Sequence, residues 1–142
     1  MLIGAIGTGK STFAEKYCIA LNLNCLSGDQ IEQEFSTRDN NEVEHEIMLR
    51  IIEYFESGQS FLLDGLNINQ SSRTRYLLMA QKYNYDIIAY NFGPGNENSL
   101  ERRINENRDI PETRWRELAE RNRTEFQSPN KSEGFSKIYR LY

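Results

Sequence analysis

The stretch GAIGTGKST, from Gly4 to Thr12, constrains the fold of this chain more than any other feature of its sequence. It has the spacing Gly-x-x-x-x-Gly-Lys-Ser, in which glycines let backbone N–H groups converge on phosphate groups. The apolar residues 1–3 precede it and a periodic, helix-like stretch over residues 11–23 follows it. The sequence therefore predicts a phosphate-binding loop that joins a strand to a helix.

Short apolar runs alternate with longer periodic stretches along the rest of the chain, which is typical of strands joined by crossover helices. The expected strands are residues 1–3, 24–27, 60–64, 85–92 and 135–142, and the expected helices are residues 11–23, 41–58 and 71–83. We expect the polar, helical residues 99–126, which are interrupted at Pro111, to form a lid. The pattern predicts one α/β domain over residues 1–142 with the P-loop NTPase fold, in which helices flank a central parallel sheet of about five strands.

Composition indicates a globular protein of the cytoplasm. Of the 142 residues 38% are hydrophobic and 27% charged, and no apolar run approaches the roughly 18 residues that a membrane-spanning helix needs. Cys18 and Cys25 are too few for a disulfide framework, and no charged and apolar leader precedes the glycine-rich stretch. The net charge of −4 argues against non-specific nucleic-acid binding over the whole surface. We expect no contact with a membrane.

The glycine-rich stretch predicts binding of ATP together with Mg²⁺. Lys10 is expected to bridge the β- and γ-phosphates, and the Ser11 hydroxyl to be a ligand of Mg²⁺. The remaining residues of the loop are expected to surround the phosphates with backbone N–H groups and with the N-terminus of the following helix: Gly4, Gly7, Thr8, Gly9 and Thr12.

Two aspartates follow predicted strands, at the edge of a parallel sheet where ligands bind. Asp29, after residues 24–27, could orient an acceptor hydroxyl and take its proton, or it could cap a helix over residues 30–35. Asp64, at the end of residues 60–64, could reach the metal's water shell or the acceptor, or it could belong to an Asp-Gly turn. We expect Asn67 and Arg73 to contribute an amide and a guanidinium at the same rim.

The predicted lid is rich in arginines, and a mobile lid can bring a cation to the charge that develops on a transferred phosphoryl group. Arg108 is the first candidate for this role and Arg103 the second. For most of the other arginines we expect surface pairing with glutamates at helical spacing.

In order along the chain, the phosphate loop, SGD, LLDGLNINQSSR, ERRINENRD and SEGFSKIYRLY resemble the kinase domain of bacteriophage and bacterial polynucleotide 5′-hydroxyl kinases. The resemblance implies transfer of the γ-phosphoryl group of ATP to a 5′-hydroxyl end of RNA or DNA, as in nucleic acid repair. It also implies that Asp29 is the general base and that Arg108 contacts the transferred phosphate. A ligase or phosphatase partner and the oligomeric state are left open.

The chain departs from that family's pattern at Glu32, where an arginine often holds the acceptor, and at Leu66. We expect Arg38, Arg73 or Arg75 to bind the acceptor instead. Two alternatives remain: a P-loop kinase of a nucleoside or another small metabolite, and an ATP-binding regulatory switch that phosphorylates no acceptor. A carboxylate at Asp29 beside the loop argues against the switch.

Overall fold

The computed structural model describes residues 1–106 and 110–142, and its strands all run in parallel. One sheet has the order β1-β4-β5 and a second pairs β2 with β3. The strands are β1 (Leu2–Ile3), β2 (Asn24–Ser27), β3 (Phe61–Asp64), β4 (Ile88–Asn91) and β5 (Lys137–Arg140). Each falls within a predicted range, so the predicted parallel sheet is confirmed.

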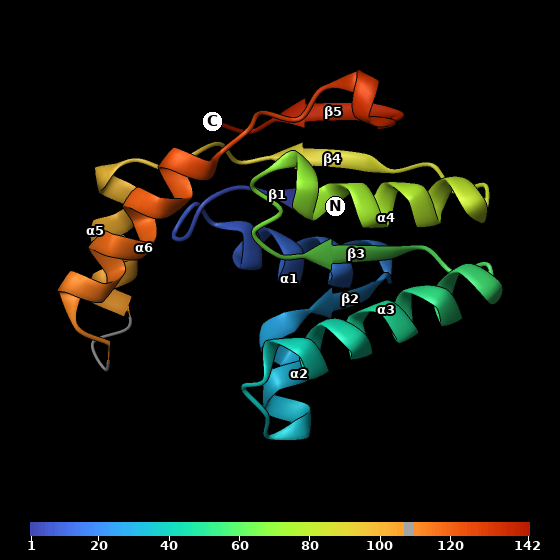
Figure 1. Cartoon of the computed structure of the whole chain (residues 1–142), viewed down its shortest axis with the longest axis horizontal. Coiled ribbons are helices and arrows are strands. Elements are labelled where there is room, and N and C mark those ends of the chain that lie inside the picture. Colours follow the sequence, from blue (N-terminus) through green and yellow to red (C-terminus); the bar gives the residue numbers. More distant parts are fainter. Residues whose placement is uncertain (107–109) are drawn as a thin grey trace.

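The two sheets meet where β1 lies beside β3 (Figure 1). The N–H of Gly4 donates to the carbonyl of Leu66 at 2.9 Å, and the amide of the Asn67 side chain donates to the carbonyl of Leu2 at 2.9 Å. These two bonds link the loop after β3 to β1 and Gly4. The strands therefore form one continuous layer with β1 near its centre, although β1 is only 2 residues long.

Helix α1 (Lys10–Leu21) covers one face of this layer, and α3 (Asn40–Glu56) and α4 (Gln70–Lys82) cover the other. The remaining helices are α2 (Gly28–Phe35), which packs against α3, and the pair α5 (Glu97–Glu106) and α6 (Glu112–Glu125). Because successive strand residues point to opposite faces, Leu2 and Leu62 pack with residues of α1, whereas Ile3 and Leu63 pack with α3 and α4. None of the helices in the described part of the chain combines the length and the apolar character that crossing a bilayer requires.

The helix ends agree with the sequence at Gly58 and correct it at Asp29. Helix α3 ends at Glu56, and Gly58 just beyond it has φ of 70°, a conformation that glycine adopts without strain. Helix α2 begins at Gly28 with Ser27 as its N-cap residue. The alternative prediction, that Asp29 caps this helix, is therefore wrong. Asp29 is instead in the first turn of α2, where a carboxylate is also favoured by the helix dipole.

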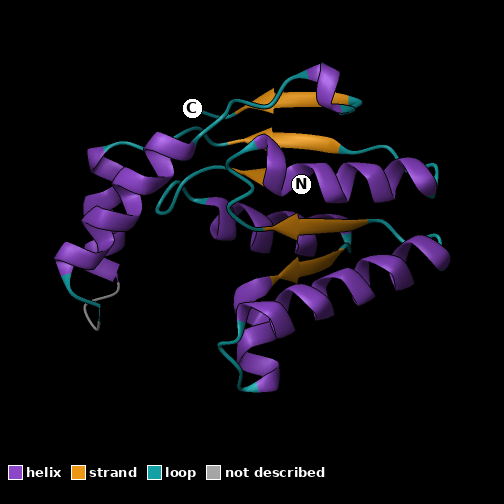
Figure 2. Cartoon of the chain, viewed as in Figure 1, coloured by secondary structure: helices purple, strands orange, loops and turns teal. Residues whose placement is uncertain are grey.

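Helices α5 and α6 pack against each other at the side of the sheet to which the strand arrows point (Figure 2). Leu100, Trp115 and Ala119 form the buried contact between them, and Ile6 of the glycine-rich loop packs against it. The N–H of Ile6 also donates to the side chain of Asn122 at 3.1 Å. The predicted lid is therefore a pair of helices that is attached to the loop at its base.

Candidate active site

A cleft of about 730 Å³ lies at the carboxyl ends of β2 and β3. It is bounded by the glycine-rich loop, by α2 and α3 on one side, and by α5 and α6 on the other. The charged side chains that line it are Lys10, Asp29, Glu32, Glu44, Asp64, Arg75, Arg102, Arg103 and Glu106. The carboxyl edge of a parallel sheet is where this class of fold binds ligands, and the cleft fits that rule.

The backbone of the loop at Gly7 and Gly9 has the geometry of an anion site. Gly7 has φ of 71° and Gly9 has φ of 92°, and both line the cleft. Gly9 caps α1 without a side-chain hydrogen bond to the helix, which leaves N–H groups of the first turn to bind a phosphate. At Gly7 a Cβ atom would lie 2.2 Å from the carbonyl oxygen of Ser99, so α5 packs directly on the loop backbone.

Two predicted loop residues do not face the cleft. Gly4 is buried, and its N–H donates to Leu66 rather than to a phosphate, which corrects the role given to it from the sequence. A Cβ at Gly4 would lie 2.9 Å from the Cβ of Phe92, so this position needs glycine for close packing. The Thr8 hydroxyl donates to the carbonyl of Ala5 at 2.8 Å and braces the loop.

Lys10 is a buried cation that donates a hydrogen bond to a neutral group. Its Nζ donates to the carbonyl of Ala5 at 2.7 Å, and no ion pair of Lys10 occurs within residues 1–106 and 110–142. Burial lowers the pKa of Lys10 to about 8, while the nearby Asp64 opposes that shift. A bound phosphate would supply the missing negative charge, so this site fits the phosphates of a nucleotide.

Asp64 and Ser11 provide oxygen atoms next to Lys10. Asp64 ends β3 and is buried, and burial raises the pKa of its carboxyl, whereas the hydrogen bond with Ser11 and the charge of Lys10 lower it. Hydroxyl and carboxylate oxygens are the ligands that Mg²⁺ prefers, usually with waters and substrate phosphates completing the octahedron. The described residues hold no group of three or more His, Cys, Asp or Glu side chains arranged for a metal. Ser11 and Asp64, which share a hydrogen bond, could hold Mg²⁺ together with the phosphates of a nucleotide.

Asp29 reaches the cleft from the first turn of α2, which follows the neighbouring strand β2. Ser27 at the end of β2 lies in register with Asp64 at the end of β3, and Asp29 follows two residues later. Its carboxylate is exposed, and its charge raises the pKa of Lys10, as does that of Asp64. The structure therefore brings Asp29 to the same cavity as Lys10 and Ser11.

The lid contributes Arg102 and Arg103 from α5 and Trp115 from α6. The guanidinium carbon of Arg103 lies 4.9 Å from the centroid of the Trp115 ring, a cation–π contact that holds the arginine at the cleft. Arg108, the first candidate from the sequence, lies outside the described residues. Arg102 was not predicted, because the surface positions of a polar helix look alike in sequence.

Most other lid arginines pair with glutamates at the surface, as the sequence predicts. Arg116 pairs with Glu97, Glu101 and Glu112, and Arg121 pairs with Glu125. These side chains are between a third and three quarters exposed, so the individual pairs contribute little to stability.

The predicted acceptor residues are only partly brought to the cleft. Arg73 has an exposed fraction of 0%, is paired with Glu133 at 2.7 Å, and donates to the carbonyls of Asn67 and Gln127. It is therefore not presented at the rim, which corrects the sequence expectation. Asn67 touches the cleft, but its buried side chain bonds to the backbone of β1. Arg38 is exposed between α2 and α3, away from the cleft lining.

The sequence names Arg75 as an alternative acceptor residue, but it gives no indication that Arg75 pairs with Glu44 on the acceptor side of the cleft. Arg75 of α4 pairs with Glu44 of α3 at 2.6 Å, and its guanidinium carbon lies 4.6 Å from the centroid of the Tyr76 ring. Helical spacing could have separated Arg73 from Arg75, because residues two apart in a helix cannot lie on one face of α4. With Arg73 on the buried face, Arg75 had to point elsewhere.

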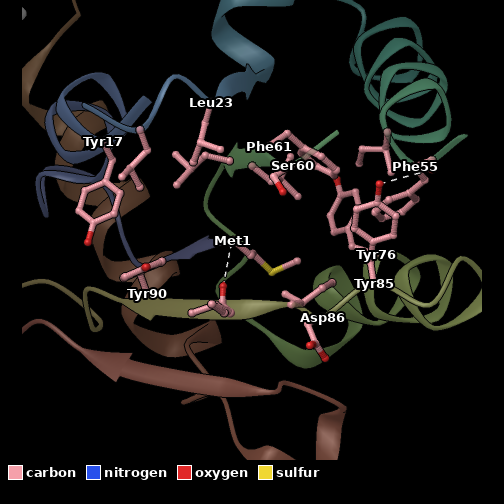
Figure 3. A pocket seen from close by; sticks show the side chains of 16 residues that line it. Met1, Tyr17, Leu23, Phe55, Ser60, Phe61, Tyr76, Tyr85, Asp86 and Tyr90 are labelled. Atoms are coloured by element: carbon pink, nitrogen blue, oxygen red, sulfur yellow. Dashed lines mark hydrogen bonds between the residues drawn. The ribbon is translucent and has the colours of Figure 1, made fainter. Parts of the chain in front are cut away.

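A second, apolar pocket of about 340 Å³ lies toward the amino ends of β3 and β4 (Figure 3). Phe55, Phe61, Tyr85 and Tyr90 are among its walls, and none of the residues that line it is basic. The nitrogen of Met1 donates to the carbonyl of Ile88 at 2.9 Å beside it. This pocket is lined by no lysine, arginine or histidine side chain that would bind phosphate.

The fold and the cleft define a P-loop kinase-like α/β domain. Residues 1–124 match the model of a family described as AAA domain, and the chain belongs to that family. No curated protein sequence matches the chain. Its structure is similar to a crystal structure of a candidate kinase from Chloroflexus aurantiacus J-10-fl, with a TM-score of 0.63 and 19% sequence identity over 99% of this chain and 83% of the other. At that identity the likeness shows the fold.

Proposed function

We propose that this protein is an ATP-dependent phosphotransferase that moves the γ-phosphoryl group to a hydroxyl of an acceptor. The observation that supports this most is the arrangement of the cleft, in which one cavity holds the buried Lys10, the Ser11–Asp64 pair and the exposed carboxylate of Asp29. A nucleotide-binding switch needs the first two features but has no use for Asp29.

The residues divide the reaction between them. Lys10 and the loop N–H groups would hold the phosphates, Ser11 and Asp64 would hold Mg²⁺, which would neutralise charge that develops on the phosphates, and Arg103 would add positive charge from the lid. Asp29 accepts the proton of the acceptor hydroxyl as its oxygen forms a bond to the γ-phosphorus. The bond between that phosphorus and the oxygen bridging to the β-phosphate breaks, and ADP leaves with the electron pair.

The sequence resemblance favours a 5′-hydroxyl end of RNA or DNA as the acceptor. For this acceptor, Arg75 is the cation on the α3–α4 side of the cleft that could meet a phosphate, because Arg73 is buried and Arg38 lies elsewhere. A small hydroxyl compound is the second candidate. It is favoured by the carboxylates of Asp29, Glu32 and Glu44, which line that same side.

The test is incubation with Mg²⁺, γ-labelled ATP and either a short 5′-hydroxyl oligonucleotide or the matching free nucleoside. We expect label on an acceptor with the natural chain and none with Lys10→Ala, while Lys82→Ala, a change on the exposed end of α4, behaves as the natural chain does. Label on the oligonucleotide alone would establish the nucleic-acid acceptor. ATP hydrolysis with label on no acceptor would contradict the proposal and favour the switch.

A further inference from the structure

Charges in the cleft are segregated between its two sides. The phosphate loop and α5 carry three cations, Lys10, Arg102 and Arg103, which suit the phosphates of a nucleotide and outnumber the carboxylates of Glu106 on α5 and Asp64 at the end of β3. The opposite side, formed by α2, α3 and α4, carries Asp29, Glu32 and Glu44 against the single cation Arg75. An acceptor must lie on this second side, because the nucleotide occupies the first.

The single cation on the acceptor side is already engaged. Arg75 is 2.6 Å from Glu44, stacks over Tyr76, and donates to the Tyr76 hydroxyl at 2.9 Å. Arg75 and Glu44 cancel each other's charge, so the net charge that an acceptor meets comes from Asp29 and Glu32.

Glu32 has no role in the phosphoryl transfer described above. It lies three residues after Asp29 in α2, a spacing that places both side chains on one face of the helix. Glu32 is half-buried and lines the cleft, and within residues 1–106 and 110–142 no ion pair of Glu32 is found. Its carboxylate is thus available to a bound molecule, about one helical turn from the base.

We propose, on the basis of the phosphotransferase function above, that the acceptor carries a cationic amine beside its reacting hydroxyl and that Glu32 binds this amine. Glu32 is then a specificity-determining residue: it attracts an ammonium group and repels a phosphate at the same place. The acceptor class is a small amino alcohol or amino sugar, and a nucleic-acid end with its adjacent phosphate is disfavoured.

Three nucleosides that share one 5′-hydroxyl test the charge of the neighbouring group: 3′-amino-3′-deoxythymidine, thymidine and thymidine 3′-monophosphate. Two quantities are measured at a pH where the amine is protonated. One is kcat/KM for transfer from γ-labelled ATP, and the other is the Kd of each compound for the protein loaded with ADP and Mg²⁺. We expect the amine to be best and the phosphate worst, each step being about 3- to 5-fold, as for a partly exposed charge pair.

Variants at Glu32 separate charge from shape. Glu32→Gln keeps the size of the side chain and should bring the three compounds to within about twofold of each other, while Glu32→Arg should reverse the order. Glu53→Gln is the matched control, because Glu53 is exposed at the far end of α3 and does not line the cleft. It should leave the natural order intact.

The outcomes distinguish this inference from the function on which it rests. Binding that follows the expected order without any label on the acceptors would contradict phosphotransfer to a hydroxyl and leave the charge preference standing. The inference is overturned if the 3′-phosphate compound binds as well as thymidine or better. It is equally overturned if the three compounds bind alike or not measurably, or if Glu32→Gln leaves their ratios unchanged.

Discussion

The two cavities of this protein, the charged cleft and the apolar pocket, lie toward opposite ends of the same parallel strands and differ in chemistry. The cleft at the carboxyl ends is lined by nine charged residues, whereas the smaller pocket toward the amino ends is lined by aromatic and aliphatic side chains with Asp86 as its charged residue. Both are concave, so shape does not identify the site. The two cavities differ in chemistry because the loops at the carboxyl ends of the strands carry glycines, hydroxyls and carboxylates. Helix N-termini also point into the cleft at that end.

The largest difference between the two cavities is expected in the rate of phosphoryl transfer when one aspartate in each is replaced. Asp29→Asn should reduce phosphoryl transfer about 10²- to 10⁴-fold, because the amide cannot accept the proton of the acceptor hydroxyl. Asp86→Asn, at the apolar pocket, should leave the rate within about twofold. The measurement is kcat for labelled product at saturating ATP, with ATP binding checked separately. If the two changes reduced kcat equally, the idea that only the cleft takes part in phosphoryl transfer would be contradicted.

A change in the apolar pocket should act on stability instead. Phe55 is buried between α3 and the strands, in ring contact with Phe61, Tyr83 and Tyr85. Phe55→Ala should lower the free energy of unfolding by about 3–5 kcal/mol, and the molecules that remain folded should keep their kcat. Denaturant unfolding measures the first effect. Leu78→Ala, at an exposed position of α4, is the control and should change stability by at most about 0.5 kcal/mol. Loss of kcat in folded Phe55→Ala would tie the pocket to function.

The smallest expected effect is a pH dependence that belongs to the cleft alone. Burial lowers the pKa of Lys10 to about 8, so above that pH the empty site loses the charge that attracts ATP. Bound phosphates favour the protonated form, and binding must then take up a proton. ATP affinity should fall about threefold between roughly pH 7.5 and 8.5, measured by calorimetry.

The same shift has the opposite sign for folding. The unfolded chain holds the Lys10 proton up to its ordinary pKa of 10.5, so the contribution of Lys10 to the stability of the empty protein grows as the pH rises from about 8 toward that value. In Lys10→Met both pH dependences should disappear. If ATP binding by this variant kept the same pH dependence, another group would be responsible for it.

Local patterns were sufficient to predict the strands, the loop and several residues of the cleft. The glycine spacing predicts the roles of Lys10 and Ser11, and a carboxylate at or just after the end of a predicted strand identifies Asp29 and Asp64 as candidates. Both signals depend only on residues that are close in the sequence. Their place in one cavity follows from the parallel strands, whose carboxyl ends meet at one edge.

The residues that could not be predicted depend on distant partners. Arg73 is buried because Glu133, 60 residues away, and two backbone carbonyls satisfy its guanidinium, and no local pattern contains that information. In the same way, the N–H of Gly4 is hydrogen-bonded to the carbonyl of Leu66, which is distant in the sequence. Glu44 and Arg75 come together only because α3 and α4 cover the same face of the sheet.

The contacts at the base of the lid determine how it can move. Ser99 of α5 touches the backbone of Gly7, and Asn122 of α6 holds the N–H of Ile6, so both helices are fixed to the loop at their inner ends. The two helices are therefore coupled to the phosphate loop, so a displacement of Ile6 or Gly7 would be transmitted to their inner ends.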